Sequence, residues 1–367
     1  MKMELQLNSL DEQYIGRCLQ LARCGRGSTS PNPMVGAVIV CDGRIIGEGY
    51  HIRAGEPHAE VNAVRSVKDC DKELLSRSTI YVSLEPCSHY GKTPPCCDLI
   101  ISCGIPRVVI AATDINAQVN GAGIARMRAA GIEVVTGVLD DEAYKLNETF
   151  FTLHKQGRPY ITLKWAETAD GFIDKLRGSA SEGEALAIST PESLVAMHRL
   201  RACCDAIMVG SRTALFDNPS LTVRHWGGRN PLRLVVDRDN SLPSTQRIFD
   251  GTVPTVLYTY TPVKEKYGKN VKQIALSAEK DFLSQILSHL ADMKINSLLV
   301  EGGANLLNLF LDSDLWDAIR VERNPSLFIG NGVRAPQIPE GVNEVVESCG
   351  GNEIHYFAHK KKLNYYK

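Results

Sequence analysis

Residues 79–100, TIYVSLEPCSHYGKTPPCCDLI, join an apolar strand, a polar loop and the start of a helix. The run 79–86 has the length and apolar character of a buried strand. Pro94 and Pro95 fit the first turn of a helix that continues through DLIISCG at 98–104. A buried strand that leads into a helix is the building unit of a layered α/β domain.

Further short apolar runs flank this stretch and predict buried strands beside it. They lie at 35–40, 107–113 and 132–138, while helix-like segments lie at 11–27 and 58–66. Strands that alternate with helices favour an α/β fold in which helices pack on a sheet.

The chain is long enough for two domains, because it has 367 residues and single cores stop growing at roughly 250–300 residues. Gly157-Arg158-Pro159 forms a turn-like break in the middle of the chain. We therefore place a boundary within 148–158 and predict domains at 1–150 and 151–367. The second half repeats the α/β pattern, with predicted strands at 205–210, 232–237, 255–260 and 297–303 and predicted helices at 191–201 and 281–293.

Composition restricts the function classes. The chain has 44% hydrophobic and 23% charged residues and a formal net charge of −1, so no global field attracts nucleic acid or an anionic membrane. The first residues hold no apolar signal-peptide core, and no apolar run has the length needed to cross a bilayer. Eleven irregularly spaced cysteines favour thiols and metal ligands over a disulfide framework. We expect a cytoplasmic protein without a membrane or nucleic-acid partner.

Four residues predict a zinc site: His58, Glu60, Cys87 and Cys96. One imidazole and two thiolates suit tetrahedral Zn²⁺ with the fourth position open to water, whose pKa the metal lowers toward neutrality. Glu60 lies two residues after the histidine, where it can carry a proton to departing ammonia without binding the metal. His-x-Glu followed by Pro-Cys and a second cysteine is the signature of zinc deaminases that act on cytosine or adenine. Their usual gap between the cysteines is two residues, whereas here it is eight.

Cys97 competes with Cys96 as the third ligand. Adjacent helical residues point about 100° apart, so one of the two must miss the metal. We favour Cys96, because it directly follows the prolines and a helix N-terminus favours its thiolate. A closed structural zinc site or reduced core cysteines are the alternatives. The remaining cysteines are expected to be buried or inert thiols: Cys18, Cys24, Cys41, Cys70, Cys103, Cys203, Cys204 and Cys349.

The chain resembles the bifunctional riboflavin-biosynthesis deaminase–reductases along nearly its whole length. The eight-residue gap with its Ser-His-x-Gly-x-Thr-Pro-Pro pattern is the most distinctive piece. The segments that carry the resemblance are SPNPMVGAVIV (30–40), GYHIRAGEPHAE (49–60), SLEPCSHYGKTPPCCDLI (83–100), LKWAETADG (163–171), RLRACCDAIMVGSRTALFDNPSLTVR (199–224) and LLVEGGANLL (298–307).

The resemblance implies a cytidine-deaminase-like three-layer domain followed by a dihydrofolate-reductase-like domain. It implies two reactions: Zn²⁺-dependent hydrolysis of the 2-amino group of a diamino-hydroxy-phosphoribosylaminopyrimidine, then reduction of the ribose arm to ribityl by NADPH. The partner is then a small phosphoribosylated pyrimidine, and we expect a homo-oligomer. The expected deaminase substrate contacts are Asn32, His89, Lys92 and Thr93.

The second domain contains a strand that runs into Gly302-Gly303 and then a helix, a junction whose backbone N–H groups suit a dinucleotide pyrophosphate. No Gly-x-Gly-x-x-Gly opens a βαβ unit, so an ordinary Rossmann domain is disfavoured. The resemblance implies cofactor contacts at Ala166, Thr213, Asp217, Gly302, Gly303, Ala304, Asn305, Leu306 and Leu307. It implies reductase substrate contacts at Arg201, Leu221, Arg224 and Glu301.

Two departures from the family pattern bear on the reductase. Ala187-Ile188-Ser189-Thr190 stands where the family usually has Trp-Ile-Thr, and Asp217-Asn218 stands where it usually has two acids. An alternative hypothesis therefore treats the second domain as a binding or assembly module only. A nucleic-acid base deaminase is a third hypothesis, which the near-zero net charge disfavours.

Overall fold

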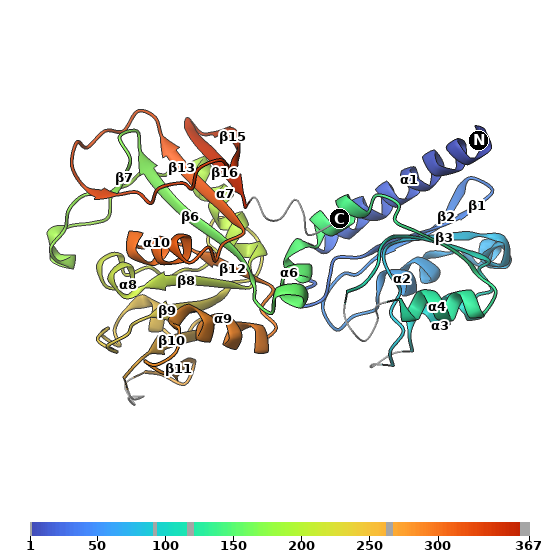
Figure 1. Cartoon of the computed structure of the whole chain (residues 1–367), viewed down its shortest axis with the longest axis horizontal. Helices are drawn as coiled ribbons and strands as arrows, with labels where there is room; N and C mark the ends of the chain where they lie inside the picture. The colour runs from blue at the N-terminus through green and yellow to red at the C-terminus, as the bar shows by residue number, and fades with distance from the viewer. Residues whose placement is uncertain (1, 91–93, 116–120, 262–266, 360–367) are drawn as a thin grey trace. The chain divides into compact units, whose positions relative to one another are not determined.

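The computed structural model describes residues 2–90, 94–115, 121–261 and 267–359. The chain divides into two compact units, Met1–Gln156 and Gly157–Lys367, and each contains its own principal sheet (Figure 1). Within the described part, none of the helices combines the length and the apolar character that spanning a lipid bilayer requires.

The first unit is built on a five-stranded sheet. Its strands are β1 (Gly36–Cys41), β2 (Arg44–Tyr50), β3 (Thr79–Leu84), β4 (Arg107–Ala112) and β5 (Glu133–Thr136). They lie in the order β2-β1-β3-β4-β5. β1 pairs antiparallel with β2 and β3, whereas β3, β4 and β5 run parallel.

Helices cover both faces of this sheet. They are α1 (Lys2–Ala22), α2 (Ala59–Ser66), α3 (Cys96–Ser102), α4 (Ala122–Ala129), α5 (Asp140–Leu146) and α6 (Glu148–Gln156), with 3-10 turns at Arg23–Gly25 and Asp69–Arg77. Alternate strand residues point to opposite faces, so Ala37 and Ile39 pack with α2, α3 and α4, while Val38 and Val40 pack with α1, α5 and α6. α1 lies over one face and α2, α3 and α4 over the other (Figure 1). The predicted three-layer domain is confirmed.

The second unit is built on a nine-stranded sheet in the order β11-β10-β9-β8-β12-β6-β13-β16-β15. The strands are β6 (Tyr160–Thr168), β8 (Ala206–Gly210), β9 (Leu232–Val236), β10 (Thr255–Thr259), β11 (Val271–Ala275), β12 (Ser297–Val300), β13 (Ala318–Asn324), β15 (Asn343–Cys349) and β16 (Asn352–Ala358). All neighbours from β11 to β13 run parallel, and only the edge formed by β13, β16 and β15 is antiparallel. A separate two-stranded ladder joins β7 (Phe172–Asp174) and β14 (Val333–Arg334).

The helices of the second unit are α7 (Pro191–Cys203), α8 (Ser211–Asp217), α9 (Phe282–Asp292) and α10 (Ala304–Asp312), with 3-10 turns at Ala180–Glu182 and Arg247–Phe249. α9 and α10 pack on one face of the sheet, while α7 and α8 contribute to a separate core with the other face. Thr190 and Ser193 form a capping box that starts α7, with Pro191 at the first helical position.

Most predicted elements are confirmed to within a few residues, while some differ in their bounds and others, such as β11 and β13, were not predicted. The first helix already begins at Lys2, ahead of the predicted segment 11–27. α3 begins at Cys96 and not at the prolines, because Pro95 keeps extended backbone with ψ 145. The hairpin of β15 and β16 is not predicted, because the residues of β15 are exposed along nearly the whole strand and form no apolar face.

Candidate metal and cofactor sites

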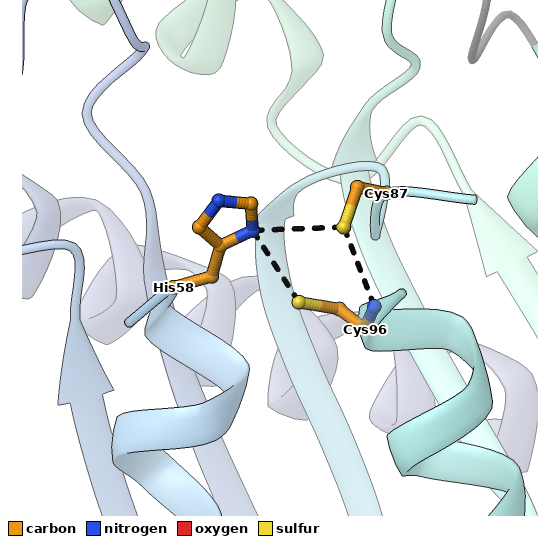
Figure 2. Close-up of side chains that lie close together, drawn as sticks. All are labelled: His58, Cys87 and Cys96. Atoms are coloured by element: carbon orange, nitrogen blue, oxygen red, sulfur yellow. Dashed lines mark hydrogen bonds between the residues drawn. The ribbon is translucent and has the colours of Figure 1, made fainter. Parts of the chain in front are cut away.

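Three side chains from separate elements of the first unit converge. His58 is the N-cap of α2, Cys87 follows β3, and Cys96 is the first residue of α3. His58 Nδ1 lies 3.6 Å from Cys87 Sγ and 3.4 Å from Cys96 Sγ, as Figure 2 shows. The three possible ligand atoms lie within 4.8 Å of one another.

These distances match a tetrahedral zinc site. With Zn–S near 2.3 Å and Zn–N near 2.0 Å, a nitrogen and a sulfur ligand stand about 3.5 Å apart. The Cys96 amide donates to Cys87 Sγ at 3.3 Å. Hydrogen bonds from the Cys96 thiol, His58 and this amide lower the pKa of Cys87 to about 4, despite its burial. The donor set therefore fits Zn²⁺ in both chemistry and spacing.

Cys97 faces away from this cluster. It is fully buried and packs in the core between the sheet and α2, α3 and α4. Burial raises the pKa of its thiol to about 11. Cys96 and not Cys97 lies beside His58, as expected for adjacent residues on a helix.

Glu60 lies in the first turn of α2 beside the cluster, and only 3% of its surface is exposed. Burial raises the pKa of its carboxyl to about 7, although His58 and Cys96 favour the charged form. A carboxyl group with this pKa can both accept and release a proton near neutral pH.

Asn32 is linked to the metal cluster by His51, a residue that the sequence analysis did not single out. Its Nδ2 lies 3.2 Å from His51 Nε2, while His51 Nδ1 lies 3.1 Å from the Pro57 carbonyl oxygen. Since that oxygen only accepts, Nδ1 carries the proton and Asn32 donates to Nε2. The ring of His51 packs edge-on against His58 at 5.4 Å. His51 lies in the quoted segment 49–60, but a single histidine there carries no distinguishing signal.

The inserted loop is described only in part. His89 is exposed. Lys92 and Thr93 lie outside the described residues.

The second unit contains a cavity of about 730 Å³. It lies where the ends of β6, β8, β9 and β12 meet the starts of α8 and α10. All nine residues expected on the cofactor side line it: Ala166, Thr213, Asp217, Gly302, Gly303, Ala304, Asn305, Leu306 and Leu307. Glu301, expected on the substrate side, lines the same cavity.

The glycine pair at the start of α10 is required by close packing. A Cβ on Gly302 would lie 3.0 Å from Thr213 Cγ2, and Gly303 has φ +74, a conformation that disfavours other residues. The backbone therefore approaches α8 closely beside the cavity.

The other expected substrate residues have different surroundings. Arg201 donates two hydrogen bonds to Glu301, and both side chains are largely buried. Leu221 packs in the core shared with α7 and is only 2% exposed. Arg224 is exposed, and its amide donates to His198 Nδ1 at 2.9 Å.

Within the two stretches that depart from the family pattern, Ile188, Ser189 and Asp217 line the cavity, whereas Ala187 and Asn218 do not. Ala187 is exposed, whereas its neighbours Leu186 and Ile188 line the cavity. Asn218 instead accepts from the Arg247 amide at 2.7 Å. Arg177, buried and paired with Asp217, also lines the cavity and was not singled out from the sequence.

Comparison with known proteins assigns both units. Residues 8–112 match the cytidine and deoxycytidylate deaminase zinc-binding region, and residues 159–347 match the RibD C-terminal domain. Riboflavin biosynthesis protein RibD of Aquifex aeolicus is 39% identical over 345 residues, which cover 93% of this chain and 94% of that protein. The RibD of Escherichia coli is 38% identical over 354 residues, with 92% and 94% covered.

Solved structures agree. A diaminohydroxyphosphoribosylaminopyrimidine deaminase/5-amino-6-(5-phosphoribosylamino)uracil reductase from Thermotoga maritima is 37% identical, has a TM-score of 0.85, and covers 96% of this chain and 99% of its own. RibD from Acinetobacter baumannii (form 1) is 31% identical, with a TM-score of 0.86 and the same coverage.

Together these matches define a zinc-binding deaminase domain followed by a reductase domain with the predicted dihydrofolate-reductase-like fold. The chain belongs to the family of riboflavin biosynthesis protein RibD. It is a bifunctional deaminase–reductase of riboflavin biosynthesis, with zinc and NADPH as its cofactors.

Proposed function

We propose that the first unit hydrolyses an amino group from a diaminohydroxyphosphoribosylaminopyrimidine. The second unit then reduces the deaminated product, 5-amino-6-(5-phosphoribosylamino)uracil, with NADPH. The cluster of His58, Cys87 and Cys96 with buried Glu60 beside it is the observation that carries the deaminase assignment. The similar Thermotoga maritima protein is a deaminase and reductase of these two compounds.

In the first reaction, His58, Cys87 and Cys96 would hold the zinc ion. Bound zinc supplies a Lewis acid that activates water near neutral pH. Glu60 accepts a proton as water adds to the amino-bearing ring carbon, and returns it to the nitrogen as ammonia leaves. One water is consumed and one ammonia is released, and a C–N bond is replaced by C=O.

Substrate recognition in the first unit is assigned to Asn32, His89, Lys92 and Thr93. Asn32 is held by its hydrogen bond to His51, which leaves its amide oxygen in a fixed position for the ring of the pyrimidine. His89 is exposed, as suits a contact with a charged phosphoribosyl arm. The roles of Lys92 and Thr93 rest on their position in the polar inserted loop.

In the second reaction, the cavity of the second unit would hold NADPH. The pyrophosphate is assigned to the backbone around Gly302, Gly303 and the start of α10, because amide groups at a helix N-terminus attract anions. Arg201, Leu221, Arg224 and Glu301 are assigned to the substrate. Bound NADPH would supply the hydride for the first carbon of the opened ribose, with the proton from solvent, and the residues of the cavity would contribute by positioning the two reactants.

These assignments give the deaminase to residues 1–150 and the reductase to residues 151–367. The alternative, a second unit that only binds or assembles, was motivated by Ala187 and Asn218. Neither residue lines the cavity, and the Asn218 side chain accepts a hydrogen bond from the Arg247 amide within the loop region that follows α8. A complete cofactor-side lining therefore favours a working reductase.

The proposal also includes a homo-oligomer in the cytoplasm that acts on small molecules and not on nucleic acid. It is supported by the bacterial riboflavin-pathway relatives and by a net charge of −1.

Zinc-loaded full-length protein tests both halves in one assay. Ammonia release is measured with the diaminopyrimidine, and NADPH absorbance is followed after the deaminated product is added. We expect ammonia first and NADPH oxidation second. Absent ammonia release overturns the deaminase assignment, while flat absorbance with saturating NADPH supports the binding-module alternative.

A further inference from the structure

The loop 218–224 follows α8 and has no regular secondary structure. Asn218 and Leu221 both have left-handed backbone, with φ 41 and φ 51. Such conformations are uncommon for residues with side chains and persist only where the surroundings hold them.

Side chains from other elements hold this loop at every second residue. Arg247 Nε donates to the Asn218 carbonyl oxygen at 2.6 Å, and Arg233 Nη1 donates to the Ser220 carbonyl oxygen at 3.3 Å. Arg201 Nη1 donates to the Thr222 carbonyl oxygen at 3.3 Å, and the Arg224 backbone amide donates to His198 Nδ1 at 2.9 Å.

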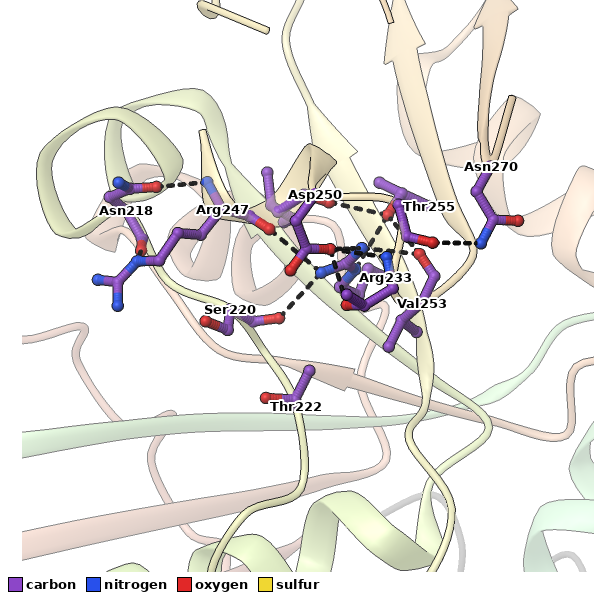
Figure 3. A network of polar contacts seen from close by, with 12 residues as sticks. Asn218, Ser220, Thr222, Arg233, Arg247, Asp250, Val253, Thr255 and Asn270 are labelled. Carbon is purple, nitrogen blue, oxygen red and sulfur yellow. Dashed lines mark hydrogen bonds and ion pairs between the residues drawn. The ribbon is translucent and has the colours of Figure 1, made fainter. Parts of the chain in front are cut away.

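Arg233, on β9, is the most buried of these anchors, with 0% of its surface exposed. Every guanidinium nitrogen has a partner within the network that Figure 3 shows. Nε donates to Thr255 Oγ1 at 3.0 Å, Nη1 to the carbonyl oxygens of Ser220 and Arg247 at 3.3 Å each, and Nη2 to Asp250 Oδ1 at 2.9 Å and the Val253 oxygen at 2.7 Å.

A fully buried charge is costly unless it is paired and hydrogen-bonded. Asp250 provides the opposite charge, and the planar fork of arginine provides five N–H donors, whereas the ammonium group of lysine provides three. Arg233 Nη1 donates to the carbonyl oxygens of both Ser220 and Arg247, and the Arg247 side chain in turn donates to the carbonyl oxygen of Asn218. Arg233 therefore fixes both the loop and one of its other anchors.

We propose that Arg233 is a positioning residue of the reductase. It holds the loop 218–224 so that the exposed Arg224 guanidinium faces the phosphoribosyl arm of the pyrimidine. Arg233 itself touches no ligand, because it has no exposed surface. What the loop binds rests on the proposed function above, whereas the control of its conformation by Arg233 does not.

Arg233→Lys tests this role, with Arg158→Lys as the matched control. Arg158 also forms a two-bond ion pair in the second unit, with the buried Asp317, and is itself largely buried; this ion pair does not involve the loop. In Arg233→Lys we expect the KM for the deaminated pyrimidine to rise by about fivefold or more, while kcat and the KM for NADPH stay within about twofold. The control should keep all three constants.

Amide hydrogen exchange over 218–224 gives a readout that needs no turnover. Exchange should accelerate about tenfold in Arg233→Lys and stay unchanged in Arg158→Lys. Asp250→Asn, which keeps the shape of the partner, is the milder second variant should Arg233→Lys not fold, and we expect a smaller change in the same direction.

Unchanged exchange and unchanged KM in a folded Arg233→Lys or Asp250→Asn protein overturn the proposal, as do equal changes in the Arg158→Lys control. If wild-type protein does not oxidise NADPH, the proposed reductase function fails instead. Exchange over 218–224 then still decides the role of Arg233.

Discussion

The guanidinium of Arg201 donates two hydrogen bonds to the carboxylate of Glu301, from Nε to Oε1 at 2.9 Å and from Nη2 to Oε2 at 2.6 Å. Arg201 comes from α7, and Glu301 follows β12 beside the cavity. The pair links the helix to the end of the strand from which the glycine turn departs.

Glu301→Gln should destabilise the second unit by about 3 kcal/mol, because it leaves a buried guanidinium without its counter-charge. Burial alone raises the pKa of Glu301, but Arg201 and Lys164 bring it below its usual value. The stabilisation is therefore complete above the unfolded pKa of about 4.3 and is lost as the pH falls through the lower folded pKa.

Urea unfolding at pH 7 and at pH values below 4 checks this prediction. The difference between wild type and Glu301→Gln should be largest at pH 7 and shrink in acid. Lys72→Met, which breaks an exposed pair with Asp69 in the other unit, is the control and should change little. A difference that grows in acid would contradict the assigned direction of the pKa shift.

Glu60→Gln should reduce the kcat of deamination by roughly 100-fold or more, because the amide cannot carry the proton from water to ammonia. Zinc content should stay at the wild-type level, since Glu60 is not among the three clustered ligands. Ammonia release and metal analysis measure the two effects. Glu56→Gln, at an exposed position of the same segment, should behave as wild type; wild-type deamination by Glu60→Gln would remove Glu60 from the mechanism.

Cys96→Ala should lose zinc on dialysis, whereas Cys97→Ala should retain it. Only Cys96 lies beside His58, while Cys97 packs in the core. Metal content per chain after dialysis separates the two cysteines. Zinc loss from Cys97→Ala with unchanged circular dichroism would show that the wrong cysteine is assigned.

Gly302→Ala should weaken NADPH binding by about tenfold, because the added methyl group meets Thr213 at 3.0 Å and pushes the glycine turn from its position. Gly227→Ala is the matched control, since a Cβ there meets nothing within 4 Å. Calorimetric titration with NADPH measures both variants. Equal NADPH affinities of Gly302→Ala and Gly227→Ala would show that the glycine turn does not take part in cofactor binding.

Most central strands of the two units were predictable because each is a short run of apolar residues between turns, whereas β13, in which charged residues interrupt Ile319 and Val321, was not. Val38 and Ile39 show the limit of that signal: they are adjacent and both fully buried, yet they pack into different cores. A continuous apolar run identifies a strand covered on two faces but not which helices cover each face.

The metal cluster was predictable because its ligand types and their order match a known zinc-deaminase signature, although the ligands lie 29 and 38 residues from His58. His51 and Arg233 were not, because a single histidine and a single arginine match no such signature, and their roles appear only in their contacts with Asn32 and Ser220. The hairpin of β15 and β16 escaped prediction for a different reason, since β15 is an exposed edge strand.

The alternate anchoring of the loop 218–224 also limits how its length can vary in evolution. One inserted residue would shift each later carbonyl out of reach of its arginine, so insertions and deletions should be selected against between Asn218 and Arg224. The neighbouring exposed stretch 225–230 includes Gly227, which has open space around it. We therefore expect changes in chain length near Gly227 to be tolerated better than changes within the loop.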